Sequence, residues 1–282
     1  MTQPASSAPP IPQLISLLGE DCVRTDAAEL GPLLVDHRGL YHGDAAALIL
    51  PLWRSGLAVQ HKADESPVTE ADQRGEALIL KALAERFPDV PVISEEDASE
   101  FGTPDAIGPR FFLVDPLDGT KAFVRGDPHF TVNIGLIENG RPVAGAVSCP
   151  PSGETWYTSG GVTLKRLKGV AAQPVHARAW PKGSAIALTS HTMKVETADK
   201  LAAEYGFDLR EPMDSSIKLC RIAEGTADIY PRHGPTMEWD TAAGHAVLEA
   251  AGGRLTTPEG QPFVYGKAQD GFRNGWFVAR GA

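Results

Sequence analysis

Asp115-Pro116-Leu117-Asp118-Gly119-Thr120 is the most informative stretch of the chain, and it directly follows an apolar run, Phe111 to Val114, with the composition of a buried strand. Two carboxylates three residues apart at a strand end can converge on one point, because Pro116 stiffens the turn and Gly119 allows close backbone approach to a ligand. If a helix begins near Gly119, its free N–H groups face the same point and suit a phosphate oxygen. The alternative is an ordinary strand-to-helix turn in which Asp118 only caps the helix.

Three further acidic segments have the same character. Glu95-Glu96 follows a predicted strand, Asp240 stands at the start of a helix in Trp239-Asp240-Thr241-Ala242-Ala243-Gly244, and Asp72 precedes a helix that ends at Pro88. Each has a purely structural explanation: a solvated loop, a helix cap, or first-turn charge favoured by the helix dipole. Together with the first segment, they could supply the oxygen ligands that two Mg²⁺ ions roughly 3.5–4 Å apart require.

The composition is that of an ordinary globular protein with an acidic balance. The 282 residues are 42% hydrophobic, and 36 acidic against 26 basic side chains give a formal net charge of -10. This charge opposes sequence-independent binding to nucleic acid or to an anionic membrane. No apolar stretch approaches the ~18 residues of an integral membrane span. Cys22, Cys149 and Cys220 show neither zinc-ligand spacing nor a CxxC motif, so we expect a reducing, cytoplasmic location.

The chain divides into a tail and two halves. Residues 1–12, rich in Pro and Ser, are expected to be disordered. Residues 13–160 are expected to form an α+β half with an antiparallel sheet and most of the metal ligands. Glycines interrupt the first part of this half, residues 13–47, so we expect broken helices there without definable boundaries. Residues 161–282 are expected to form an α/β half that carries Asp240 and the substrate contacts. The fold class is therefore mixed α/β, with the two halves joined near Gly160.

Periodicity places the main elements within these halves. Strands are expected over 90–93, 111–114, 131–137, 143–147, 185–188 and 228–230, and helices over 195–205, 217–224 and 241–251. Glu138-Asn139-Gly140 is a plausible hairpin turn between two of the strands. Gly252-Gly253 provides the glycine signal expected after the last helix.

In this order, the four acidic segments resemble the lithium-sensitive, Mg²⁺-dependent phosphatase superfamily typified by inositol monophosphatase. The matching stretches are Asp64 through Asp72, Glu95-Glu96, Asp115 through Thr120 and Trp239 through Gly244, and the resemblance covers about Leu48 to Val264. It implies a layered αβαβα sandwich. It also implies two Mg²⁺ ions held by Glu95, Asp115, Asp118, Asp240 and the main-chain oxygen of Leu117, with a third, weaker ion near Asp72 and Glu95 as an option.

The resemblance implies a mechanism as well. One ion would lower the pKa of a water and hold it in line with phosphorus, while another would stabilise the leaving ester oxygen. Thr120, paired with Asp72, would pass the proton of the water toward that carboxylate, so that Thr120, Asp72 and Glu95 are the expected catalytic residues. Gly119, Thr120 and Asp240 are expected to contact the substrate.

Within the superfamily the sequence looks most like the CysQ branch, the 3′(2′),5′-bisphosphate nucleotidases. The branch resemblance lies in Lys62-Ala63-Asp64, in Phe130 through Ile134, in Ser215 through Cys220 and in Ala223 through Arg232. Asp214 departs from the branch, which usually has Gly there, and Gly271-Phe272-Arg273 matches only partly. The branch implies conversion of adenosine 3′,5′-bisphosphate to AMP and phosphate.

Two cations are candidates for contacting the second phosphate of such a substrate. Lys218 and Arg232 could supply positive charge beyond the metal ions; otherwise they are surface charges. Ser190-His191 resembles a substrate-loop pattern, but we interpret such a pair in a loop as solvated. Trp239 is expected to pack in the core beneath Asp240.

Other functions stay open at this level. The same chemistry on inositol monophosphate, fructose 1,6-bisphosphate or another sugar phosphate is the nearest alternative, because one fold hosts several substrates. A catalytically silent binding protein is opposed by the presence of a carboxylate at every expected ligand position. The sequence leaves the oligomeric state, a homodimer included, undecided.

Overall fold

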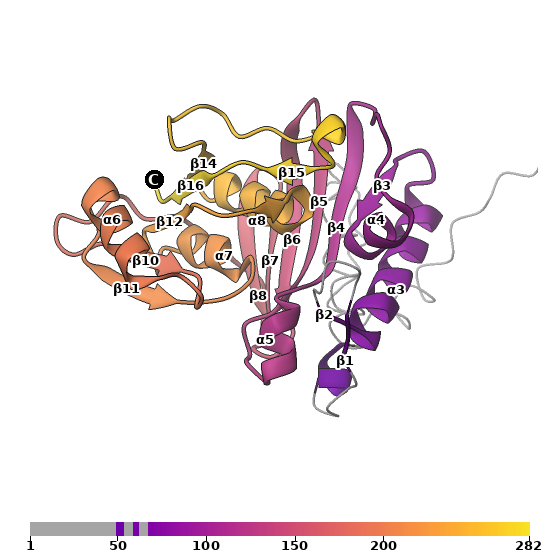
Figure 1. The fold of residues 1–282 in the computed structure, drawn as a ribbon, viewed down its shortest axis with the longest axis horizontal. Helices are drawn as coiled ribbons and strands as arrows, with labels where there is room; N and C mark the ends of the chain where they lie inside the picture. Colours follow the sequence, from indigo (N-terminus) through magenta and orange to yellow (C-terminus); the bar gives the residue numbers. More distant parts are fainter. Residues whose placement is uncertain (1–48, 54–58, 62–66) are drawn as a thin grey trace, which may run out of the picture.

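The computed structural model describes residues 49–53, 59–61 and 67–282, and it has five layers. Figure 1 shows helix α3, a large sheet, the pair α7 and α8, a smaller sheet, and α6 at the far side. The expected αβαβα sandwich is thus confirmed. The predicted tail over 1–12 and the broken helices over 13–47 lie outside the described residues, as does Asp64.

The large sheet has seven strands in sequential order. They are β3 (Val92–Ser94), β4 (Arg110–Asp118), β5 (Thr131–Glu138), β6 (Arg141–Cys149), β7 (Glu154–Ser159), β8 (Val162–Leu167) and β9 (Gln173–Val175). Only the pair β3 and β4 is parallel; all other neighbours in this sheet are antiparallel. The hairpin expected at Glu138-Asn139-Gly140 is present, with φ of 50° at Asn139 and 75° at Gly140, the positive values that a tight two-residue turn needs.

Helices cover both faces of this sheet, which explains why β4 reads as a continuous apolar run. Phe112 and Val114 pack toward α3 (Glu70–Arg86), and Phe111 and Leu113 pack in the core that contains α7 (Ile217–Ala223) and α8 (Glu238–Ala250). Trp239 is buried in this second core, as expected. The short helix α4 (Glu95–Phe101) lies beside β3, and α5 (Thr120–Arg125) follows β4 directly.

The smaller sheet has the order β11-β10-β12-β16-β14. Its strands are β10 (Ile186–Thr189), β11 (Leu209–Pro212), β12 (Ile229–Arg232), β14 (Arg254–Thr256) and β16 (Phe277–Arg280). Helix α6 (Val195–Tyr205) buries Ala198 and Leu201 against this side of the molecule. Two-stranded pairs complete the structure: β1 (Val59–His61) with β2 (Pro67–Thr69), and β13 (Thr236–Met237) with β15 (Arg273–Asn274), next to a 3₁₀ turn at Ala268–Asp270.

The join between the two halves lies later than predicted. Gly160 and Gly161 form the turn between β7 and β8, which pair antiparallel within the same sheet. The first sheet therefore continues through β9, and the alternating part begins after it. Glycines mark a sharp turn, but a hairpin inside one sheet and a crossing between layers use the same residues, so composition could not separate them.

Two glycines set the height of α8 above the large sheet. Gly135 of β5 and Gly145 of β6 are cross-strand partners. A Cβ at Gly135 would lie 2.8 Å from the Cβ of Ala242, and one at Gly145 would lie 2.3 Å from the carbonyl oxygen of Ala243. Backbone contact of this kind requires glycine on the sheet, and it holds the start of α8, with Asp240, close to the end of β4.

Candidate active site

A bulge in β4 brings Asp115 and Asp118 to the same face. In a regular strand, residues three apart point to opposite faces. Here Asp115 pairs with Asn133 and Asp118 with Thr131, so three steps along β4 match two steps along β5. The extra residue restores a common face, as a β-bulge does. The two carboxylates therefore lie on the same face of β4, because of a bulge that the sequence motif does not reveal.

Asp118 is held by groups from two other elements. Its Oδ2 accepts hydrogen bonds from the backbone N–H of Ser216 at 2.5 Å and from Asn133 Nδ2 at 3.5 Å. The hydroxyl of Ser216 donates to Asn133 Oδ1 at 2.7 Å and lies 2.9 Å from the Thr131 hydroxyl. Sequence analysis assigned no role to Asn133 or Thr131, although polar residues alternating with Val132 and Ile134 in a buried strand are a usable signal.

Asp115 and Leu117 complete the strand end. Asp115 is 1% exposed, and its Oδ1 accepts the N–H of Leu117 at 3.0 Å. The Leu117 side chain is buried in the core, while its carbonyl oxygen lies 3.2 Å from the Thr120 hydroxyl oxygen. Gly119 has φ of 97°, a left-handed conformation, and a Cβ there would lie 2.9 Å from the His129 carbonyl oxygen. Glycine is thus required for the turn itself.

Asp240 and Glu95 stand at the starts of two helices. Helix α8 begins at Glu238, earlier than the predicted Thr241, so that Asp240 occupies the third helical position and accepts the N–H of Met237 at 2.8 Å. Glu95 is the first residue of α4, so Glu95-Glu96 opens a helix and not the solvated loop that was the structural alternative for this pair. The buried Glu76 of α3 accepts the backbone N–H groups of Glu96 at 3.0 Å and of Asp97 at 3.4 Å, and so fixes the start of α4. The role of Glu76 was missed, because its position fits an amphipathic helix equally well.

The carboxylates of this site destabilise one another's charge. Burial raises the pKa of Asp118 from its ordinary 3.8 to about 6; Glu95 adds to the rise, while Lys218 and the Ser216 amide oppose it. Burial raises the pKa of Asp115 well above its usual range, with further increases from Glu95, Asp118 and Asp240. The pKa of Asp240 is raised by the same causes. Carboxylates that are partly or fully buried, repel one another and offer only oxygen ligands fit hard dications such as Mg²⁺.

The four carboxylates are spread around the site rather than gathered on one point. Within the described residues, the one tight group of three metal-ligating side chains lies elsewhere.

Thr120 and Asp72 meet across the site. The Thr120 hydroxyl lies 3.2 Å from Asp72 Oδ1, although the two residues are 48 positions apart. Asp72 is 1% exposed, and its Oδ2 accepts the N–H of Thr69 at 2.8 Å and its hydroxyl at 2.6 Å. It therefore sits in the first turn of α3, as one half of a capping box with Thr69, and still offers an oxygen to Thr120.

Lys218 and Arg232 differ in their freedom to bind a ligand. Lys218 is buried, and its Nζ donates to the carbonyl oxygens of Ser215 at 2.5 Å and Met213 at 3.1 Å. Burial lowers the pKa of Lys218 to about 8, against the opposing charge of Asp118. Arg232 donates one Nη2 hydrogen bond to Pro235, at 3.1 Å, while its Nε is buried with no hydrogen-bond partner among the described residues. Arg232 thus lines the cavity with one hydrogen bond to a backbone carbonyl, whereas the ammonium group of Lys218 is bound to two.

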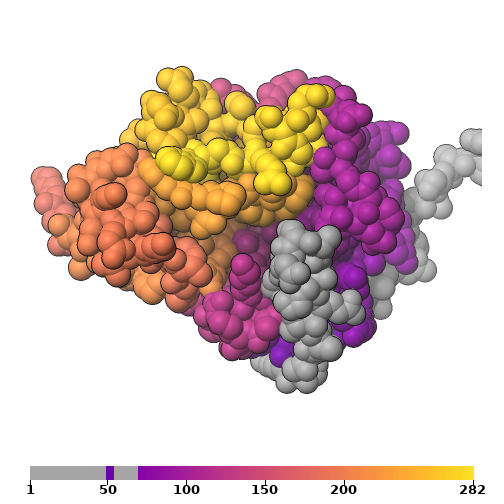
Figure 2. All heavy atoms as spheres, viewed as in Figure 1, coloured from indigo at the N-terminus to yellow at the C-terminus, as the bar shows by residue number. Residues whose placement is uncertain are grey.

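These residues surround one cavity of about 750 Å³, within the usual range for small-molecule sites. Every predicted site residue except Asp72 lines it; Asp72 is buried and reaches the site through Thr120. Figure 2 shows the molecule in space-filling form from the same side as Figure 1. In this view α5, the region of α8 and the C-terminal segments lie around the centre. Lys121, Arg125 and Arg273 also line the cavity, so cations flank the carboxylates on several elements.

The expectation for His191 at the rim holds, because this residue is exposed and lies in the turn between β10 and α6. Its Nδ1 also lies 3.3 Å from Asp214 Oδ2, and its ring stacks on that of His129 at a centroid distance of 6.1 Å. These contacts join segments distant in sequence, which a local motif cannot indicate.

The αβαβα sandwich, with carboxylates from β4, α4 and α8 around one cavity, is the architecture of a metal-dependent phosphatase. The chain belongs to the inositol monophosphatase family, whose model matches residues 38–275. Members of this family are metal-dependent.

Proteins named 3′(2′),5′-bisphosphate nucleotidase CysQ are similar over most of the chain. The one from Salmonella typhimurium is 41% identical over 208 residues, covering 72% of this chain and 81% of the relative. The one from Escherichia coli K12 is 41% identical over 213 residues, covering 74% and 83%. The crystal structure of CysQ from Bacteroides thetaiotaomicron superposes with a TM-score of 0.70 at 31% identity, covering 87% of this chain and 96% of that one. No helix among the described residues is long and apolar enough to cross a membrane.

Proposed function

We propose that this chain is a Mg²⁺-dependent phosphomonoester hydrolase that converts adenosine 3′,5′-bisphosphate to AMP and phosphate. The observation that carries the reaction class is the placement of Glu95, Asp115, Asp118 and Asp240 around one cavity beside the Thr120–Asp72 pair. The substrate follows from relatives named 3′(2′),5′-bisphosphate nucleotidase that are 41% identical over about three quarters of the chain.

Glu95, Asp115, Asp118, Asp240 and the carbonyl oxygen of Leu117 are the groups that would hold two Mg²⁺ ions, with Asp72 and Glu95 beside a third, weaker one. When bound, such ions acidify a water and neutralise the charge of the phosphate and its leaving oxygen. The bulge in β4 and the Ser216 amide keep Asp118 oriented toward the cavity before any ion arrives. Catalysis of phosphoryl transfer depends on this positioning and charge neutralisation, and no nucleophilic Ser or Cys is needed.

Thr120 and Asp72 provide a route for one proton. A threonine hydroxyl that donates to Asp72 keeps its lone pairs free to accept a hydrogen bond from the attacking water. As the water attacks phosphorus, its proton passes to the Thr120 oxygen, while the Thr120 proton moves to Asp72. The buried Asp72 is already hydrogen-bonded to Thr69, so its geometry is fixed before the substrate binds.

Arg232 is the residue we assign to the phosphate that is not cleaved. Arg232 lines the same cavity as the carboxylates, and its guanidinium can form a charge-assisted pair with a phosphate. Lys218 contributes differently, because its ammonium group is bound to two carbonyl oxygens and lowers the repulsion around Asp118. We therefore assign substrate recognition to Arg232 and support of the metal ligands to Lys218.

The proposal is tested with phosphate release and product chromatography in the presence of Mg²⁺ or of EDTA. We expect AMP and phosphate from adenosine 3′,5′-bisphosphate only with Mg²⁺. Arg232→Ala should lower kcat/KM by about 10- to 150-fold on the bisphosphate, the equivalent of roughly 1.5–3 kcal/mol for a charged hydrogen bond. On adenosine 3′-monophosphate the loss should be small.

Arg210→Ala is the matched control, because Arg210 is a surface residue paired with Asp199 and lies outside the cavity. An equal loss on both substrates in Arg232→Ala would place Arg232 in the scaffold. Turnover that persists in EDTA would remove the metal site from the mechanism.

We also propose that the protein works in a reducing compartment, the cytoplasm. Cys149 and Cys220, the cysteines among the described residues, are both buried and free. Burial raises the pKa of both thiols, which lowers their reactivity. Thiol labelling of the denatured protein from cells should find both cysteines reduced; a disulfide would contradict this location.

A further inference from the structure

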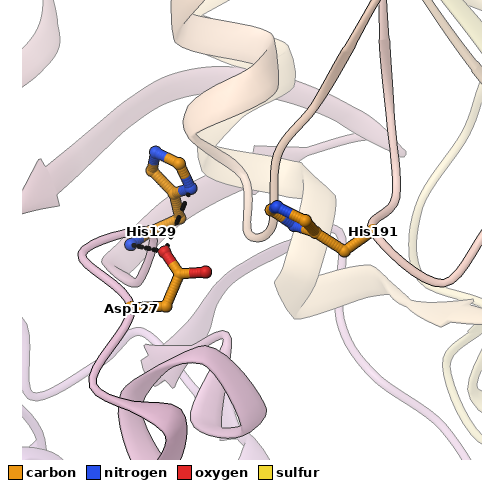
Figure 3. A group of neighbouring side chains, drawn as sticks. All are labelled: Asp127, His129 and His191. Atoms are coloured by element: carbon orange, nitrogen blue, oxygen red, sulfur yellow. Dashed lines mark hydrogen bonds and ion pairs between the residues drawn. The ribbon is translucent and has the colours of Figure 1, made fainter.

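A second group of metal-ligating side chains lies outside the carboxylate site. Asp127, His129 and His191 each place one candidate ligand atom within 4.8 Å of those of the other two. Figure 3 shows the carboxylate of Asp127 beside the ring of His129, with the ring of His191 approaching from a separate segment. Asp127 and His129 belong to the turn between α5 and β5, whereas His191 lies between β10 and α6. The group therefore connects the two sheets of the molecule.

The local contacts leave ring nitrogens available in this group. The Nδ1 of His129 is shielded from solvent and makes no well-formed hydrogen bond among the described residues; its nearest acidic atom is Asp127 Oδ1 at 3.2 Å. Asp127 Oδ1 also accepts the backbone N–H of His129 at 3.3 Å, which fixes the carboxylate next to the ring. The ring of His191 lies nearly parallel to that of His129, with an interplanar angle of 26°.

The carboxylate of Asp214 pairs with the ring of His191. Its Oδ2 lies 3.3 Å from His191 Nδ1 and 2.6 Å from Arg125 Nη2. A histidine that donates one ring N–H to a carboxylate presents its other nitrogen as a metal ligand, and this pairing fixes the tautomer and the orientation of the ring. Two carboxylates, Asp127 and Asp214, against one guanidinium, Arg125, leave a net charge of -1 at which a dication can bind.

We propose that Asp127, His129 and His191 form a binding site for a borderline transition-metal dication, with Zn²⁺ as its representative. Two imidazoles and one carboxylate suit Zn²⁺, whereas Mg²⁺ prefers an all-oxygen set like that of the carboxylate site. Tetrahedral Zn²⁺ with bonds of about 2.0–2.1 Å holds its ligand atoms about 3.3 Å apart. From separations of up to 4.8 Å, small side-chain rotations bring the three atoms together.

The three proposed ligands lie next to residues that line the cavity of the carboxylate site. Neighbours of the three ligands line the cavity: Arg125 and Asp214 directly, and Ser190 and Thr192 on either side of His191. An ion held by all three ligands ties the turn after α5 to the loop after β10 across the rim of the cavity.

The test is calorimetric titration of Zn²⁺ into the full-length protein in excess Mg²⁺, which keeps the carboxylate site occupied. We expect one Zn²⁺ per chain, and a visible absorption spectrum with nitrogen-ligand character when Co²⁺ replaces Zn²⁺. His129→Gln and His191→Gln should each weaken Zn²⁺ binding at least 10-fold. Asp214→Ala should weaken it roughly 10- to 100-fold, the usual effect of removing a carboxylate that orients a ligating histidine.

His176→Gln is the matched control, because His176 is exposed and lies outside the group. It should bind Zn²⁺ like the wild type, and circular dichroism of every variant checks that the fold is retained. Wild-type affinity in either His129→Gln or His191→Gln would overturn the site. Loss of Zn²⁺ binding in Asp118→Asn with full binding in both histidine variants would also overturn it, by placing the ion at the carboxylates.

Discussion

Asp118→Asn separates the stability of the metal-free protein from its activity. The carboxylate of Asp118 is ionised near neutral pH at a site where burial and Glu95 oppose its charge. An asparagine keeps the shape and can still accept the N–H of Ser216, but it removes that charge. We therefore expect the variant to be more stable than the wild type in EDTA and yet to lack Mg²⁺-dependent turnover, since a neutral amide holds a hard dication poorly.

The size of the effect follows from the pKa of Asp118. A rise from 3.8 to about 6 corresponds to roughly 3 kcal/mol at about 1.36 kcal/mol per pKa unit, taken as an upper limit because the side chain is partly exposed. The folded-state pKa is raised, so the carboxyl favours folding below pH 4 and this contribution is lost as the pH rises through 6. The advantage of Asp118→Asn should therefore be near zero at pH 4 and should reach about 1–3 kcal/mol at pH 8.

The assay is urea unfolding and thermal unfolding of both proteins in EDTA at several pH values between 4 and 8, repeated at pH 8 with Mg²⁺. Thermal midpoints should differ at pH 8 by several degrees, at about 2–4 °C per kcal/mol for a chain of this size. With Mg²⁺ the order should reverse, because ions that bind the folded wild type stabilise it. A variant that is less stable at pH 8 in EDTA, or a difference independent of pH, would refute this account of the site.

Three further perturbations probe the remaining parts of the site. Thr120→Val should lower kcat about 10²- to 10⁴-fold while calorimetry still detects Mg²⁺ binding, and Thr120→Ser should recover most of the activity; loss of Mg²⁺ binding in Thr120→Val would contradict a role in proton transfer. Gly145→Ala should lower the unfolding free energy by about 1–3 kcal/mol and weaken Mg²⁺ activation, because its Cβ would meet Ala243 at the base of α8. Gly183→Ala, in open space, is its control and should change neither quantity. Ca²⁺ should bind but support little turnover, because its looser coordination misplaces the water; phosphate release with Ca²⁺ equal to that with Mg²⁺ would contradict this.

Local patterns in the sequence predicted much of the fold. Both faces of β4 are covered, so Phe111 through Val114 appear as a continuous apolar run, and Asn139-Gly140 has the residues that a tight hairpin turn requires. The helix predicted over 195–205 has the same bounds in the structure. The conformation of each of these elements is set by residues adjacent in the chain, so the sequence alone is enough to predict it.

The features that assemble the site depend on contacts between distant residues, and the sequence could not supply them. The bulge between Asp115 and Asp118 is visible only in the register with β5. Glu76 resembles any polar residue of an amphipathic helix until α4 lies next to it. Arg125 and Asp214 are 89 positions apart, and nothing local indicates that they meet at 2.6 Å.

The central claim is that the carboxylate site serves a nucleotide with two phosphates. The most direct measurement compares kcat/KM for adenosine 3′,5′-bisphosphate, its 2′,5′ isomer, inositol monophosphate and fructose 1,6-bisphosphate at one Mg²⁺ concentration. We predict the highest value for adenosine 3′,5′-bisphosphate. A clearly higher value for inositol monophosphate or fructose 1,6-bisphosphate would contradict the assigned substrate, while no Mg²⁺-dependent phosphate release from any of the four would contradict the catalytic site itself.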